Sequence, residues 1–214
     1  DDGFLDLYLS NFNCWTDYSY FADTVWHNDG DGTFTEWTGT RGLYGESSTR
    51  TASRGASPID HDQDGDIDLW VNNYVLGRNL HYDNLGGGEL EENARSIGLA
   101  GHPDEVGFGS YYYGHTIGTA WGDLDGDGDF DIWMKNYQGF TDRILRNNGN
   151  LTFTQMNSWI AGDPSVDENE VDLFDYDGDG DLDAFLANFS GTNRIYQSSL
   201  ADGGGGALYT RSGS

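Results

Sequence analysis

The chain has 214 residues, enough for one domain of ordinary size or one array of repeats that share a core. Its 37 acidic and 10 basic residues give a formal charge of -27, which disfavours nucleic acid and anionic membranes as partners and favours bound cations. With 36% hydrophobic and 14% aromatic residues, the composition argues against a disordered acidic segment. The 32 Gly and 3 Pro favour tight turns between short strands over long helices.

No apolar run reaches the roughly 18 residues that a membrane-spanning helix needs, and no signal segment stands at the N-terminus, so we expect a soluble, processed chain. Cys14 is the only cysteine, which excludes an internal disulfide and leaves bound metal as the means of stabilisation. Two glycosylation sequons, at Asn150 and Asn188, agree with an extracellular location, either secreted or at the cell surface.

An internal repeat runs along the chain. Asp-rich loops recur around Gly3, Gly65, Gly128 and Gly180, at separations of 62, 63 and 52 residues. Each loop leads into a short apolar run, and an Asn-aromatic pair then follows. The apolar runs are residues 7–9, 69–71, 132–134 and 184–186, and the pairs are residues 11–12, 73–74, 136–137 and 188–189. These runs are typical of buried strands.

Further strands complete each repeat. Second strands are predicted at residues 24–27, 79–82, 143–146 and 194–197, third strands after the turns at 28–32 and 147–150, and preceding strands at 118–122 and 171–174. We therefore predict an all-β fold of repeated antiparallel, propeller-blade-like sheets joined by calcium loops, forming an open or a partial propeller. The four repeats span about 1–56, 57–119, 120–171 and 172–214, and residues 85–117 are interpreted as a loop insertion.

Three loops fit the pattern D-x-D-x-D-G-x-x-D. Calcium needs six to eight oxygen ligands, which the side chains at positions one, three, five and nine and the backbone carbonyl at position seven can supply; Gly at position six permits the sharp turn. We predict three calcium sites and include the position-seven aspartates among the candidates. The candidate residues are Asp60, Asp62, Asp64, Asp66, Asp68, Asp123, Asp125, Asp127, Asp129, Asp131, Asp175, Asp177, Asp179, Asp181 and Asp183.

Other metal sites agree less well with these loops. An EF-hand requires Glu at position twelve, where this chain has Val71, Met134 and Leu186. Magnesium prefers retained waters, and zinc prefers His or Cys, whereas the single loop histidine, His61, occupies the non-ligand position two. Three Ca²⁺ ions, with two charges each, would change the formal charge from -27 to only -21.

A partial loop stands at the N-terminus. Asp2, Gly3 and Asp6 match positions five, six and nine of the motif, so we expect a partial fourth calcium site. The remaining ligands would come from upstream residues or from another chain. By contrast, we interpret the pair Asp29 and Asp31 as an ordinary acidic turn.

The stretch Gly118-Thr-Ala-Trp-Gly-Asp-Leu-Asp-Gly-Asp-Gly-Asp-Phe-Asp-Ile-Trp133 resembles the FG-GAP and VCBS-type repeats of β-propeller proteins such as the N-terminal region of integrin α-subunits. The resemblance covers nearly the whole chain and implies calcium binding by the Asp loops. It also implies extracellular work in adhesion, matrix contact or sugar recognition. Four repeats are fewer than the usual seven blades, so we hypothesise head-to-tail assembly into a polymer or continuation in a longer chain.

Three classes of function follow. The first is a structural or adhesive scaffold that calcium rigidifies, with a protein or glycan partner. The second is calcium-dependent carbohydrate binding by aromatic side chains outside the core strands, namely Trp15, Trp37, Trp159 and Tyr111 to Tyr113.

The third class, an enzyme, is not expected. The chain has no HExxH pair, no G-x-S-x-G elbow, no Walker-type phosphate motif and no basic patch for nucleic acid. We interpret its histidines as surface or loop residues; they are His27, His61, His81, His102 and His115.

Overall fold

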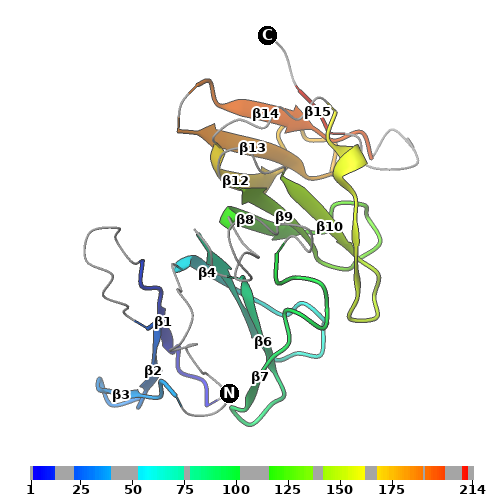
Figure 1. Ribbon diagram of the computed structural model, residues 1–214. Coiled ribbons are helices and arrows are strands. Elements are labelled where there is room, and N and C mark those ends of the chain that lie inside the picture. The colour runs from blue at the N-terminus through cyan, green and yellow to red at the C-terminus, as the bar shows by residue number, and fades with distance from the viewer. Residues whose placement is uncertain are drawn as a thin grey trace. The chain divides into compact units, whose positions relative to one another are not determined.

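The computed structural model describes residues 2–12, 22–39, 53–74, 78–101, 116–136, 142–161, 168–189, 191–200 and 209–211. Within these residues the chain forms four small antiparallel sheets (Figure 1). The helical content of the described residues is one 3₁₀ turn, η1 (Asn157–Trp159). The prediction of an all-β fold is therefore confirmed.

In every sheet the strands lie side by side in chain order. The first sheet consists of β1 (Leu7–Leu9), β2 (Thr24–Asn28) and β3 (Phe34–Glu36). The second consists of β4 (Ser53–Ile59), β5 (Asp68–Asn73), β6 (Leu80–Asn84) and β7 (Leu90–Glu92). The third consists of β8 (Thr116–Gly122), β9 (Asp131–Asn136), β10 (Arg143–Asn147) and β11 (Phe153–Gln155). The fourth consists of β12 (Glu168–Phe174), β13 (Asp183–Asn188), β14 (Arg194–Gln197) and β15 (Thr210–Arg211).

The central strands β5 and β9 are buried along nearly their whole length. Trp70 of β5 and Trp133 of β9 are both fully buried. Strands covered on both faces lose the usual alternation of apolar and polar residues, which explains their continuous apolar runs. The four runs predicted as buried strands all form strands, in β1, β5, β9 and β13. Burial is wrong for β1, because Leu7 and Leu9 are exposed.

The second, third and fourth sheets carry the same irregularity in their first strand. The register of each first strand shifts by one residue, between Ser53 and Gly55, between Thr116 and Gly118, and between Glu168 and Glu170. A β-bulge is seldom repeated by chance at the same place in three sheets. The three sheets are thus equivalent units, and β1, β2 and β3 correspond to their last three strands.

The Asn of each Asn-aromatic pair closes the hairpin that follows its strand. Its backbone N–H donates to a side-chain oxygen at the start of the next strand. These bonds run from Asn11 to Asp23, Asn73 to Asn79, Asn136 to Asp142 and Asn188 to Asn193, over 2.7, 3.0, 3.1 and 3.0 Å. The side-chain amides of Asn11, Asn73 and Asn188 also donate to a turn carbonyl. One residue thus supplies two hydrogen bonds to the turn, which explains its recurrence.

The described chain divides into two compact units, residues 1–115 and 116–214. In the first unit, Val71, Leu80 and Tyr82 form a buried cluster against which Tyr8 and Val25 of the first sheet pack. In the second unit, a larger cluster joins the third and fourth sheets. It contains Leu124, Trp133, Ile144, Trp159, Ile160, Val171, Ala184, Leu186, Tyr196 and Tyr209.

Three sequence-based expectations differ from the structure. Residues 85–117 are not simply an insertion, because they contain β7 and the first two residues of β8. The run Gly86-Gly87-Gly88, with φ of 78, 66 and 80°, forms the turn from β6 to β7. The approximate repeat boundaries fall inside β4, β8 and β12. Finally, Trp159 is 5% exposed and belongs to the core, so it cannot stack on a sugar.

Candidate metal centres

Each complete Asp loop connects the first and second strands of one sheet, as predicted from the sequence. The glycine at position six has a positive φ in all three loops, 100° at Gly65, 96° at Gly128 and 98° at Gly180. Side chains other than glycine are strained in this conformation, so the turn requires this residue. The loops consequently curl in the same way.

Carboxylate oxygens come together in every complete loop. Three groups have one oxygen per residue within 4.8 Å of the others: Asp60, Asp62 and Asp68; Asp123, Asp125 and Asp127; and Asp175, Asp177 and Asp183. The aspartates at positions one and three thus converge in all three loops, joined by position nine or position five. Asp64, Asp131 and Asp179 lie in the same loops but outside these groups.

Backbone N–H groups hold these carboxylates in place. The position-one aspartates accept a hydrogen bond from the glycine at position six, over 3.2 Å at Asp60, 3.0 Å at Asp123 and 3.2 Å at Asp175. Position three accepts from the N–H of position five over 3.3 Å in each loop. These bonds leave other lone pairs of the carboxylates for a cation, because an ionised carboxylate can accept about four bonds.

The aspartate at position nine has a structural role of its own. Asp68, Asp131 and Asp183 are fully buried, and each accepts one N–H from position two of its own loop. The other oxygen accepts a second N–H from the end of the next hairpin strand. These donors are Asn84, Asn147 and Ser198, each over 2.8 Å. Position nine therefore joins its loop to the second hairpin, whether or not a cation is bound.

Sequence reasoning did not single out Asn84 and Asn147. Besides the N–H just described, the Nδ2 of Asn84 donates to the carbonyl of Ile67, and that of Asn147 donates to the carbonyl of Phe130. Asn28 makes the same bond to Leu5 in the first sheet. Asn recurs directly before a Gly-containing turn in the first three sheets, and this recurrence could have indicated the role of these residues.

The position-seven side chains point toward the neighbouring hairpin turn. Asp181 Oδ2 accepts the backbone N–H of Leu200 over 2.9 Å. A Cβ added to Gly149 would lie 2.7 Å from Asp129 Oδ2, and a Cβ added to Gly86 would lie 3.1 Å from Asp66 Oδ2. None of these three carboxylates belongs to a converging group of the described residues. Their backbone carbonyls remain the predicted ligands.

The partial loop has the geometry of the complete ones. Gly3 has φ 91°, and Asp2 Oδ1 accepts the N–H of Phe4, the same bond that position five accepts from position seven elsewhere. Asp6 accepts the N–H of Asn28 over 2.9 Å, as position nine does in the second and third sheets. His27 adds a contact of 3.0 Å between its Nδ1 and Asp6. Asp2 and Asp6 therefore occupy their predicted loop positions.

Crowding of carboxylates affects their ionisation. Burial raises the pKa of Asp131 to about 7, although N–H bonds from Asn147 and Leu124 oppose the rise and the charges of Asp125 and Asp127 add to it. Burial and the charge of Asp127 also raise the pKa of Asp125. In the second sheet, Asp60 Oδ1 is buried and has no hydrogen-bond partner among the described residues. A buried acceptor without a donor, facing other carboxylates, fits a cation ligand.

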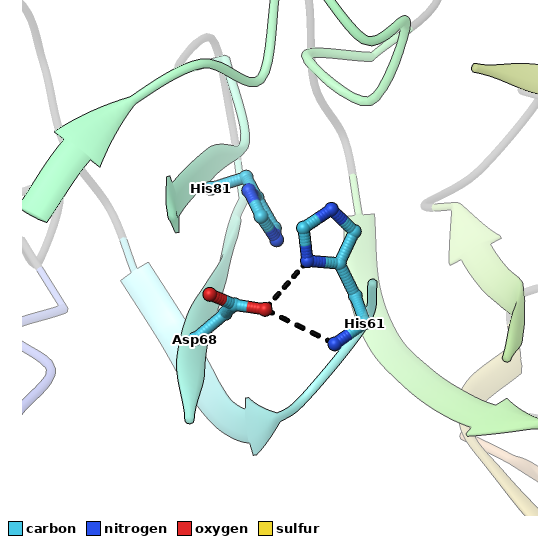
Figure 2. Close-up of side chains that lie close together, drawn as sticks. All are labelled: His61, Asp68 and His81. Atoms are coloured by element: carbon cyan, nitrogen blue, oxygen red, sulfur yellow. Dashed lines mark hydrogen bonds and ion pairs between the residues drawn. The ribbon is translucent and has the colours of Figure 1, made fainter. Parts of the chain in front are cut away.

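A different cluster lies beside the loop of the second sheet. Figure 2 shows His61, Asp68 and His81 with their polar atoms turned toward one another, and all three are buried. Asp68 Oδ2 lies 2.5 Å from His61 Nδ1 and accepts the His61 backbone N–H. The expectation of surface or loop histidines is therefore wrong for His81, which is buried in β6, whereas His61 does lie in a loop but is buried there. His102 and His115 lie outside the described residues.

The cluster shifts the pKa of its members in opposite directions. Burial opposes protonation of His61, but the hydrogen bond and charge of Asp68 outweigh it and raise the His61 pKa. Burial, reinforced by His61, lowers the pKa of His81 to about 4. Burial acts to raise the pKa of Asp68, but bonds from His61 and Asn84 lower it overall.

Comparisons with known proteins give no family assignment. A scan against protein-family models found no match, and a search of curated proteins found no significant match. None of the helical segments among the described residues is long and apolar enough to cross a membrane.

Proposed function

We propose that the chain is an extracellular calcium-binding repeat protein of the FG-GAP/VCBS type, in which calcium rigidifies a structural or adhesive β-scaffold. The observation that carries the proposal is the convergence of three carboxylates in each of three equivalent loops. All of these ligands are oxygen atoms, the type that Ca²⁺ selects. The loop backbones can add further oxygens at position seven, and water can complete the shell.

The scaffold role follows from where the loops lie. In the second, third and fourth sheets the loop joins the first strand to the second, and its position-nine aspartate also accepts an N–H at the start of the next turn. A bound cation would offset the repulsion among the loop carboxylates, and so favour the one conformation that keeps these strands in register. The equivalence of the sheets supports blade-like repeats of a propeller, and we propose no catalytic activity.

The described aromatic residues that were predicted to bind carbohydrate do not support a second function of that kind. Of its proposed aromatic residues, Trp159 is in the core, and Trp37 stacks on His27 with ring centroids 3.9 Å apart. Trp15 and Tyr111 to Tyr113 lie outside the described residues.

The partner that the proposal favours is a second copy of the chain. In the other sheets, the strand equivalent to β1 has neighbours on both sides, whereas β1 pairs with β2 alone among the described residues. Leu7 and Leu9, on one face of β1, are 46% and 48% exposed. An edge of this kind is a template for another strand, which a second copy of the chain or a further part of a longer chain would supply. Light scattering after size exclusion in calcium should show assemblies of the chain, and a folded, strictly monomeric chain would reject this part.

Calcium stoichiometry tests the main proposal. Equilibrium dialysis of the whole chain should give at least three bound Ca²⁺, and Asp62→Asn, Asp125→Asn and Asp177→Asn should each remove one site. Asp29→Asn is the matched control, because the Asp29 carboxylate accepts bonds from Thr33 and Thr35 in an acidic turn and belongs to no converging group of the described residues. It should leave the number of bound ions unchanged. Equal calcium uptake by all four variants and the parent chain would overturn the assignment of the loops.

A further inference from the structure

The second sheet differs from its equivalents at two facing positions. His61 is at position two of its loop, where the third sheet has Leu124. His81 pairs with Trp70 across the sheet, just as Ile144 pairs with Trp133. Leu124 and Ile144 are buried in one hydrophobic cluster. Two buried histidines therefore replace a buried aliphatic pair, a costly exchange unless their ring nitrogens have a use.

The two histidines converge on a carboxylate. The His61 and His81 rings meet edge to face, with centroids 4.3 Å apart at 70°. One ligand atom each of His61, Asp68 and His81 lies within 4.8 Å of the other two (Figure 2). Asp62 and Asp83 form a second, overlapping group with His61. Two imidazoles and a carboxylate, with further carboxylates adjacent, make up a donor set unlike that of the oxygen-only loops.

Hydrogen bonds fix the orientation of His81. Asn93 Nδ2 donates to Asp83 Oδ2 over 3.1 Å, so the Oδ1 of Asn93 faces His81 Nδ1 at 2.7 Å. Because this amide oxygen can only accept, Nδ1 of His81 carries the proton and Nε2 presents a lone pair. Nε2 is buried and has no hydrogen-bond partner among the described residues. This relay resembles the outer-shell bonds that orient metal-binding histidines.

We propose that His61, Asp68 and His81 bind a divalent transition-metal ion of the zinc class, at a site that adjoins the calcium loop of the second sheet and shares Asp68 with it. Zinc takes imidazole nitrogen and carboxylate oxygen at about 2.0–2.2 Å, whereas calcium selects oxygen. Binding releases the proton that lies between His61 Nδ1 and Asp68 Oδ2 to solvent. These two atoms then move from 2.5 Å to about 3.3 Å, the separation of two ligands in a tetrahedral zinc shell. Asp83 or water supplies the fourth ligand.

The third sheet supplies the matched control. The double variant His61→Leu/His81→Ile copies the residues of that sheet, so it should fold and keep its calcium. With calcium in saturating excess, the whole parent chain should bind one Zn²⁺, and Co²⁺ should show the visible absorption of tetrahedral coordination. The double variant should show neither. Equal Zn²⁺ uptake by parent and variant, or no uptake by the parent, would overturn the proposal.

A second variant keeps all three ligands. Asn93→Met copies Met156, which makes the same backbone bond to Ile144 that Asn93 makes to His81. Loss of the outer-shell acceptor should weaken Zn²⁺ binding about 10- to 100-fold, without changing calcium binding. An unchanged Zn²⁺ affinity would contradict the orientation of His81 on which the proposal depends. This readout holds even if the double variant fails to fold.

Discussion

Replacement of Asp131 by Ala separates the structural role of position nine from calcium binding. Asp131 is fully buried and accepts N–H bonds from Leu124 over 2.9 Å and from Asn147 over 2.8 Å. Alanine leaves both donors buried without an acceptor, at about 1–3 kcal/mol each. The expected loss is roughly 3 kcal/mol, which corresponds to a fall in Tm of about 10–25 °C for a domain of roughly 100 residues.

The assay is urea unfolding in chelator at pH 6, below the Asp131 pKa of about 7, because ionisation of this buried carboxylate at higher pH would itself cost stability and oppose the expected loss. Asp125→Ala is the matched control from the same loop, because Asp125 is one of the converging ligands. Without calcium it should change the unfolding free energy by less than about 0.5 kcal/mol, since it removes a crowded charge and no buried anchor. If both variants lose the same stability in chelator, or Asp131→Ala loses none, the distinction between anchor and ligand is wrong.

Three further predictions concern single side chains. Asn147→Ala should cost about 1–2 kcal/mol in urea unfolding, because its side chain bonds to Phe130, and Asn147→Ser should cost less, since the fourth sheet has Ser198 there. Trp159→Ala should lower the unfolding free energy by about 3–5 kcal/mol by opening a core cavity; a surface-like loss below 1 kcal/mol would contradict its burial. In a secreted expression host, mass spectrometry should find glycan at the exposed Asn150. It should find little at Asn188, whose Nδ2 donates to a turn carbonyl; the reverse pattern would refute this.

The strand-loop-strand units could be predicted because their determinants are local. Alternating Asp, Gly at position six and an apolar run are read within about fifteen residues, and the structure places them as a loop and a central strand. By contrast, β7 was missed because Leu90-Glu-Glu92 lacks β-branched and aromatic residues. Its pairing with β6 decides its conformation, and pairing is not visible in a short window.

The two-histidine cluster was missed for a similar reason. His61 and His81 stand 20 residues apart, and only the pairing of β6 with β5 brings them together. Because position two of the loop is not a calcium ligand, the loop pattern does not indicate a binding role for His61. A comparison of the repeats would have provided a signal, because both positions carry aliphatic residues, Leu124 and Ile144, in the third sheet.

Thermal unfolding of the whole chain with calcium and with chelator tests the central claim most directly. Each site filled at 1,000 times its Kd adds about 4.1 kcal/mol to the unfolding free energy of the folded state. Calcium should therefore raise the Tm by tens of degrees, and magnesium at the same concentration should raise it much less. The same Tm in calcium and in chelator would contradict the account of the Asp loops as calcium sites.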